Sequence, residues 1–254
     1  MRLLGNQIAS QIKKGLIRRP NLTAFFVVVQ VGQDPVSNLY VKKKVEFAKD
    51  IGVPIEVKKT SKDKIEKDLR SLSKDDRVKG IIVQLPLPEG LDREKVLGII
   101  PKEKDVDGFN YILNRPFKSY PPTILAISKI MTDYNLPVKE GVLIIGGGFL
   151  VGSPLRKFLN EKGIKAKILT KDDPDYDKKI KNSDVVVVAT GGGRYFGQKD
   201  FKQGAFVIDA STVADEGKTR GDVNPEGELI NLAPVPRGVG PVTVAMLFKN
   251  LYDL

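Results

Sequence analysis

An aromatic ring and an amine share one face of a predicted helix near the start of the chain. The stretch 31–44 reads VGQDPVSNLYVKKK, with Tyr40 and Lys44 four residues apart, a spacing that places both on the same helix face. It follows the apolar run 24–29, which predicts a buried strand that ends in a turn. A ring that can stack and an amine that can move a proton could belong to an active site, and a solvated surface pair is the alternative.

The composition limits which chemistry is available. The 254 residues include no cysteine and no histidine, which excludes disulfides, thiolate nucleophiles, Ser-His-Asp triads and Cys/His zinc sites. We therefore expect no metal, and proton transfer near neutral pH that uses Lys, Asp, Glu, Tyr or water. The absence of a long apolar run or a signal-peptide pattern predicts a cytoplasmic protein that does not enter a membrane.

The net charge of +11, from 42 basic and 31 acidic residues, is compatible with several anionic partners. Nucleic acid is one such partner, and phosphate- or carboxylate-bearing small molecules are another. The basic residues are dispersed along the chain and are not interleaved with aromatic residues. We therefore expect most of them to lie on solvated helix faces, with no nucleic-acid partner.

The first half of the chain alternates predicted strands and helices. This order is typical of a parallel α/β sheet. After a first amphipathic helix at 3–16, the predicted strands are 25–31, 53–58 and 80–85, and the predicted helices are 37–50, 62–72 and 93–99.

The second half begins after a proline-containing stretch and predicts a Rossmann-like domain, because its first strand feeds a glycine loop and a helix. The predicted fold is therefore α/β with two domains: residues 1–114 with the C-terminal helix 241–254, and residues 115–240. The predicted strands of the second domain are 142–145, 165–169, 184–189, 206–210 and 229–232, and its helices are 124–133 and 154–161.

The glycine loop predicts a dinucleotide site. Such loops let a diphosphate approach main-chain N–H groups at a helix start, although here the usual third glycine position is Val151 and the next glycine comes one residue later. At the end of the following strand, a hydroxyl and an amine favour NADP, whereas the adjacent Asp172 leaves NAD open. The predicted cofactor-binding residues are Gly146, Gly147, Gly148, Val151, Thr170, Lys171, Thr190 and Gly191.

Four motifs in order resemble the bifunctional methylenetetrahydrofolate dehydrogenase/cyclohydrolase family. They are VGQDPVSNLYVKKK at 31–44, IVQLPLP at 82–88, KDVDG at 104–108 and PVPRGVGPVT at 234–243. The resemblance covers nearly the whole chain. It implies a folate-binding domain completed by the final helix, a Rossmann domain, a folate site in the cleft between them, and a homodimer.

The resemblance also implies a two-step reaction in one-carbon metabolism, with a product used in purine biosynthesis. NADP would take a hydride from 5,10-methylenetetrahydrofolate, and water would then open the methenyl product to 10-formyltetrahydrofolate. It implies that Lys44 is the catalytic lysine, that Tyr40 packs on the folate, that Gln84 hydrogen-bonds near the lysine and that Asp107 holds the pterin. The remaining implied substrate contacts are Leu85, Pro86, Gly240 and Pro241.

A neutral lysine can serve this reaction if its pKa falls. Burial and a neighbouring cationic substrate would lower the pKa of Lys44 from about 10.4, and the neutral Gln84 can orient the amine without restoring its charge. Without the resemblance, Gln84 would be read as the end of a strand stopped by prolines, and Asp107 as part of an Asp-Gly turn.

Several departures from the family pattern concern the cofactor. Gly147 and Gly148 replace a usual Arg-Ser pair, which removes two expected contacts to the 2′-phosphate of NADP. Lys171 is the main candidate to compensate, and Arg194 is a second. Arg237 replaces a common glycine and is expected to meet a glutamate tail or solvent.

Three alternatives remain. They are a dehydrogenase without hydrolase activity, another two-domain NAD(P) dehydrogenase acting on a hydroxy acid or a shikimate-like substrate, and a basic nucleic-acid-binding module. Retention of Lys44 argues against a dehydrogenase without hydrolase activity. The motifs outside the glycine loop disfavour another two-domain dehydrogenase, and the dispersed charge disfavours a nucleic-acid-binding module.

Overall fold

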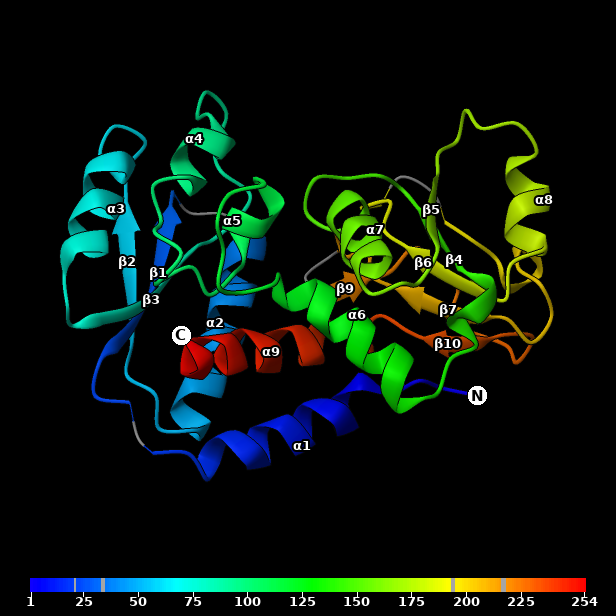
Figure 1. Cartoon of the computed structure of the whole chain (residues 1–254), viewed down its shortest axis with the longest axis horizontal. Coiled ribbons are helices and arrows are strands. Elements are labelled where there is room, and N and C mark those ends of the chain that lie inside the picture. The colour runs from blue at the N-terminus through cyan, green and yellow to red at the C-terminus, as the bar shows by residue number, and fades with distance from the viewer. Residues whose placement is uncertain (21, 33–34, 193–194, 216–217) are drawn as a thin grey trace. The chain divides into compact units, whose positions relative to one another are not determined.

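The chain forms two compact α/β units in a computed structural model (Figure 1) that describes every residue except 21, 33–34, 193–194 and 216–217. The first unit comprises residues 10–122 and 244–254, and the second comprises residues 1–9 and 123–243. Residues 1–9, which were predicted to be part of the first domain, belong to the second unit. The N–H groups of Leu3 and Gly5 donate there to the carbonyls of Leu232 and Arg237, both at 2.8 Å.

The first unit has a parallel three-stranded sheet of order β2-β1-β3. Val28 of the central strand lies opposite Val57 on one side and Ile82 on the other. β1 is buried at six of its seven positions, which explains its unbroken apolar run. The strands are β1 (Phe25–Val31), β2 (Ile55–Thr60) and β3 (Val78–Val83), and the helices are α2 (Pro35–Asp50), α3 (Ile65–Lys74), α4 (Arg93–Leu97) and α5 (Phe109–Ile112).

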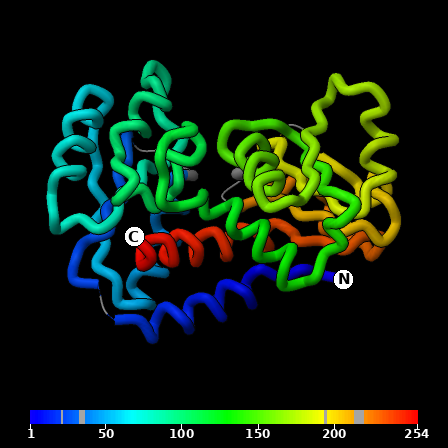
Figure 2. Tube along the Cα trace, in the orientation of Figure 1, coloured from blue at the N-terminus to red at the C-terminus, as the bar shows by residue number. Residues whose placement is uncertain are grey.

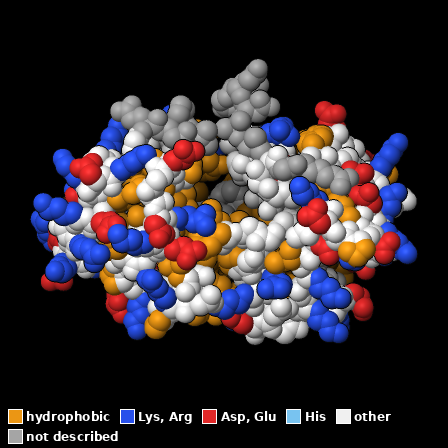
Figure 3. All heavy atoms as spheres, turned by 90° about the horizontal axis from the view of Figure 1, so that it is seen from above, with side chains coloured by type: hydrophobic (Ala, Val, Ile, Leu, Met, Phe, Trp, Pro, Cys, Tyr) orange, Lys and Arg blue, Asp and Glu red, His pale blue; other side chains and the backbone are white. Residues whose placement is uncertain are grey.

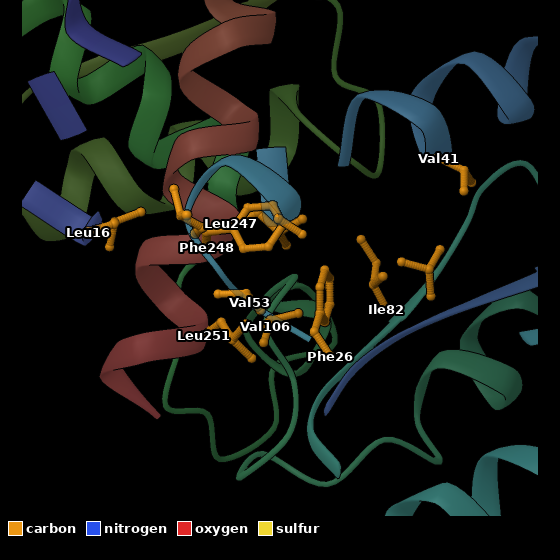
Figure 4. Close-up of a cluster of buried hydrophobic side chains, with 12 residues drawn as sticks. Leu16, Phe26, Val41, Val53, Ile82, Val106, Leu247, Phe248 and Leu251 are labelled. Atoms are coloured by element: carbon orange, nitrogen blue, oxygen red, sulfur yellow. The ribbon is translucent and has the colours of Figure 1, made fainter. Parts of the chain in front are cut away.

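The last helix of the chain, α9 (Val239–Asp253), completes the core of the first unit. Phe248 packs edge-on against Phe26 of β1, with ring centroids 5.4 Å apart, and stacks on Phe47 of α2 at 5.0 Å. Figure 4 shows Phe248, Leu247 and Phe26 in one cluster, to which α1 (Gly5–Ile17) adds Leu16. Following the trace in Figure 2, the red C-terminal end thus lies beside the blue α2.

The second unit has a parallel five-stranded sheet of order β10-β7-β6-β4-β5. β4 lies between β5 and β6, so the strand order reverses beside it, and ligands bind at such reversal points in open α/β sheets. The strands are β4 (Val142–Ile145), β5 (Ala166–Leu169), β6 (Val185–Val188), β7 (Phe206–Asp209) and β10 (Asn231–Ala233), and the helices are α6 (Pro122–Asp133), α7 (Gly152–Glu161) and α8 (Tyr176–Lys181).

The predicted two-domain α/β fold is confirmed. Each predicted strand and helix has a counterpart, with shifts of a few residues at the ends. Elements that were not predicted are α5, α8, the hairpin of β8 (Val213–Asp215) and β9 (Lys218–Arg220), and the short 3₁₀ turns Val138–Glu140 and Gln198–Asp200.

Among the described residues, no group of three or more acidic side chains is arranged to hold a metal ion. No helix in that part of the chain is long and apolar enough to cross a membrane.

Candidate functional site

The first unit brings the predicted lysine and glutamine together at the carboxyl end of β3. Lys44 reaches from α2 to Gln84, which directly follows the strand, and its Nζ lies 2.7 Å from Oε1. Gln84 is buried, and its Nε2 donates to the Leu85 carbonyl at 2.7 Å. Because that bond uses the N–H side of the amide, the carbonyl oxygen must face the amine.

Burial moves the pKa values of Lys44 and Asp107 toward each other. Burial lowers the pKa of the Lys44 amine, against the opposing effect of the Asp107 charge. Burial raises the pKa of the Asp107 carboxyl to about 7; the Lys44 charge opposes this shift and the Asp105 charge adds to it. Both side chains are partly exposed, so a substrate can reach an amine and a carboxyl whose pKa values are shifted toward each other.

Asp105 supports the turn that carries Asp107. Its carboxylate is buried and accepts the N–H groups of Phe109 and Asn110 at 3.1 and 2.7 Å, and the Asn110 side chain at 2.9 Å. Gly108 stands in the left-handed region at φ 69°, which favours glycine. Sequence reasoning missed this role, although the KDVDG run contains both carboxylates.

The other predicted substrate contacts come from α2, from the segment after β3 and from the start of α9. Tyr40 is partly exposed, and the Lys43 amine lies 5.4 Å from the centre of its ring. Ser37 approaches the Leu85 carbonyl from the same helix at 3.5 Å, and Pro86 follows Leu85 through a cis peptide bond. Gly240 and Pro241 belong to the second unit, where Gly240 is exposed at the start of α9.

In the second unit the glycine loop joins β4 to α7 with the packing that a dinucleotide site requires. Gly146 has φ 98°, and a Cβ there would lie 2.6 Å from the Ala189 carbonyl oxygen. A Cβ at Gly152 would lie 1.9 Å from the Gly146 oxygen. Gly152 therefore allows the helix to pack closely on the loop, although it comes one residue later than in the usual fingerprint.

The loop surface itself is open. A Cβ at Gly148 would meet no atom within 4 Å, and Ser153 donates to the Gly147 carbonyl at 2.7 Å, which holds the loop against the first turn of α7. Val151 immediately precedes that helix. An uncovered glycine loop before a helix N-terminus fits the diphosphate of a dinucleotide.

The strand ends beside the loop carry the other predicted cofactor residues. Thr170 and Lys171 are exposed after β5, but both the N–H and the hydroxyl of Thr170 donate to Asp173, at 2.7 and 2.8 Å. The Thr170 hydroxyl is therefore already used within the chain, whereas the Lys171 side chain is exposed. Thr190 and Gly191 lie after β6, and Arg194 is outside the described residues.

These features define a class: a two-unit α/β protein with a dinucleotide-binding unit and a separate unit that carries a buried lysine site. Residues 3–107 match the family model of the tetrahydrofolate dehydrogenase/cyclohydrolase catalytic domain, and residues 121–254 match that of its NAD(P)-binding domain. The chain belongs to the tetrahydrofolate dehydrogenase/cyclohydrolase family.

Individual relatives match over almost their whole lengths. The bifunctional protein FolD of Staphylococcus saprophyticus is 36% identical, with 97% of this chain and 93% of the relative covered. The bifunctional FolD crystal structure from Campylobacter jejuni has a TM-score of 0.88 at 29% identity, covering 99% and 96% of the two chains. The Trypanosoma brucei enzyme complexed with NADP and an inhibitor has a TM-score of 0.85 at 27% identity, covering 98% and 95%.

Proposed function

We propose that this chain oxidises 5,10-methylenetetrahydrofolate to the methenyl form with NADP and hydrolyses that product to 10-formyltetrahydrofolate. The observation that carries the proposal is the part-buried, hydrogen-bonded Lys44–Gln84 pair beside Asp107, in a chain of this family. A bound nucleotide supplies the hydride acceptor for the first reaction. The second reaction needs only water and this chain's own groups.

Lys44 acts on the water in the hydrolysis. Its lowered pKa increases the neutral fraction of the amine, which removes one proton as the water oxygen attacks the methenyl carbon. The bond between that carbon and N5 then breaks as the formyl carbonyl forms, and the second water proton ends on N5. Gln84 holds the amine in place without a negative charge that would favour its protonated form.

The substrate contacts follow from the same group. Asp107 offers carboxyl oxygens to the amino and ring N–H groups of the pterin, and Asp105 keeps its turn in shape. Tyr40 supplies a partly exposed ring for the folate to pack on. The remaining proposed substrate contacts are Leu85, Pro86, Gly240 and Pro241.

The proposed preference for NADP depends on Lys171. The exposed Lys171 amine would pair with the 2′-phosphate. The Asp173 carboxylate, which accepts the Thr170 N–H and lies 3.7 Å from Lys179, would repel that phosphate. Lys171→Ala should raise the KM for NADP about tenfold and leave the KM for NAD within about twofold. Asp173→Asn is the matched variant and should lower the KM for NADP; equal changes for both cofactors in Lys171→Ala would exclude this role for Lys171.

Assembly and cellular role complete the proposal. We propose a cytoplasmic homodimer whose product enters purine biosynthesis, as the family resemblance implies. Light scattering of the purified chain at micromolar concentration tests the dimer, and a purine requirement after loss of the gene tests the role.

The decisive experiment measures both reactions on one sample. Methylenetetrahydrofolate is supplied with NADP or NAD, reduced nucleotide is followed by absorbance, and the decay of added methenyltetrahydrofolate is then recorded. Lys44→Met should lose hydrolysis by a factor of about 100 or more, whereas Lys42→Met, an exposed lysine on the same helix, should keep it. Hydrolysis retained in Lys44→Met would exclude the proton-transfer role. Dehydrogenation without hydrolysis in the unaltered chain would favour a dehydrogenase-only member.

A further inference from the structure

Two buried carboxylates in the second unit have no part in the proposed chemistry. Asp209, the last residue of β7, has no exposed surface, and Asp222, just after β9, is 1% exposed. A buried carboxylate is costly unless donors satisfy its oxygens. The donors of these two groups therefore show which parts of the chain they hold.

Asp222 holds the turn that follows β6. One oxygen, Oδ2, accepts both the Thr190 hydroxyl and the Gly192 N–H, the latter at 2.9 Å. Gly191 and Gly192 have φ values of 67° and 92°, so this turn uses a backbone shape that is rare without glycine. Because this one oxygen binds the residues before and after Gly191, it selects that backbone shape from the many that a glycine pair permits.

The same turn lies against the glycine loop. The Ala189 carbonyl, one residue before Thr190, is the group that a Cβ on Gly146 would approach to 2.6 Å. A shift in the 190–192 turn would therefore reach the loop that is proposed to hold the diphosphate.

Asp209 in turn holds the segment that presents Asp222. Its Oδ2 accepts the Val223 N–H at 2.9 Å, and its Oδ1 accepts the Ser211 N–H at 3.0 Å. Gly221 lies so close that a Cβ there would be 2.1 Å from Oδ2. The residues on both sides of Asp222 are therefore fixed by a carboxylate at the end of the neighbouring strand.

We propose that Asp222 is a positioning residue for nucleotide binding, which shapes the Thr190–Gly192 turn, and that Asp209 holds Asp222 in place. The proposal rests on the proposed function, since it takes Thr190 and Gly191 as cofactor contacts. It assigns Asp222 to the dehydrogenase reaction alone, because hydrolysis uses no nucleotide.

That division supplies the test. Asp222→Ala should weaken NADP binding, measured by calorimetry, and raise the KM for NADP about tenfold or more, with methenyl hydrolysis unchanged. Asp222→Asn keeps an oxygen for both donors and should recover most of the binding. Asp200→Ala is the matched control, because Asp200 also accepts a main-chain N–H, that of Gly197 at 2.9 Å, outside the 190–192 turn.

The opposite results are equally distinct. Wild-type NADP affinity in Asp222→Ala, or an equal loss of hydrolysis and nucleotide binding in Asp222→Asn, would overturn the positioning role. If Asp222→Ala does not fold, Thr190→Val decides: it removes one donor and should weaken binding, and unchanged affinity would count against the proposal. If the unaltered chain binds NADP but catalyses neither reaction, the proposed function fails, and the binding comparison still decides the role of Asp222.

Discussion

At the scale of single residues, the lack of histidine determines which groups of the first unit can transfer protons near neutral pH. The chain contains no histidine, so its proton carrier near neutral pH must be a group with a shifted pKa. Lys44 has a pKa lowered by burial, and Asp107 has a pKa raised to about 7 by the same cause. The shift lowers the free energy needed to neutralise the amine, and it allows the Asp107 carboxyl to gain or lose a proton near pH 7.

The neutrality of Gln84 is the feature that a single substitution can test. In Gln84→Glu a carboxylate would stand about where Oε1 now lies, 2.7 Å from the Lys44 amine. The carboxylate stabilises the ammonium form, so it raises the pKa of Lys44. In the proposed mechanism the neutral amine is the reactive form, so the rising limb of the pH–rate profile for hydrolysis should move up by about one pH unit or more.

The measurement is the rate of methenyl hydrolysis at a series of pH values for Gln84→Glu and the unaltered chain. The variant should be slower at pH 7 and approach the unaltered rate as the pH rises. A profile that falls without moving would mean that Gln84 acts by packing and that Lys44 is not the titrating group.

At the scale of elements, the β4–loop–α7 unit tolerates an irregular glycine spacing. The contact between Gly152 and the Gly146 carbonyl is the constraint that the fold requires, while the surface of the loop at Gly148 is open. Gly152 therefore serves packing, whereas Gly148, four residues earlier, leaves room for a ligand.

Paired alanine substitutions separate these roles. Gly152→Ala places a Cβ 1.9 Å from the Gly146 oxygen, which forces the loop and the helix apart and should lower the free energy of unfolding by about 1–3 kcal/mol. Gly148→Ala meets no atom within 4 Å and should change it by less than about 0.5 kcal/mol. Urea titration followed by circular dichroism measures both, and equal stabilities would show that the close contact does not constrain the fold.

The long elements were predictable from the sequence because their apolar patterns match their burial. β1 is buried along almost its whole length, and the glycines at 146 and 152 mark a strand-to-helix turn. α5 is only four residues long and α8 six, too short for helical periodicity to emerge. α8 also lies in a strongly charged segment, and only one of its residues, Ile180, is buried.

The candidate site was predictable in its residue types and less so in its partners. The motifs indicated Lys44, Gln84 and Asp107, and the structure places the first two in direct contact. The pattern did not show that the Thr170 hydroxyl donates to Asp173. It also did not show that Asp105 supports the turn at Asp107, or that Asp222 supports the turn at 190–192. Those bonds depend on turn geometry and long-range contacts, which spacing along the chain does not encode.

At the scale of the whole molecule, charge and connectivity have different consequences. In the face shown in Figure 3, basic side chains are scattered among acidic ones, as their dispersal in the sequence predicts. On this face the net charge of +11 is therefore not gathered into a continuous basic surface of the kind that binds nucleic acid.

The chain also closes each unit with a segment from its far end. Residues 1–9 belong to the second unit and residues 244–254 to the first. Asn250 of α9 donates to the carbonyls of Val106 and Tyr120, each at 2.9 Å, so the last helix contacts the segment that carries Asp107. The segment that carries Asp107 is therefore held in part by a side chain of α9.

This dependence predicts a large cost for Phe248→Ala. The ring is fully buried between Phe26 and Phe47, and removing it leaves a cavity that should lower the free energy of unfolding by about 3–5 kcal/mol. Lys249→Ala, on the exposed side of the same helix, removes only a surface ion pair with Asp253 and should cost less than about 1 kcal/mol. Urea titration with hydrolysis as the readout follows the first unit directly. If the two variants lose hydrolysis at the same urea concentration, α9 does not stabilise the unit that carries Lys44, and a chain truncated after residue 243 should then keep the activity.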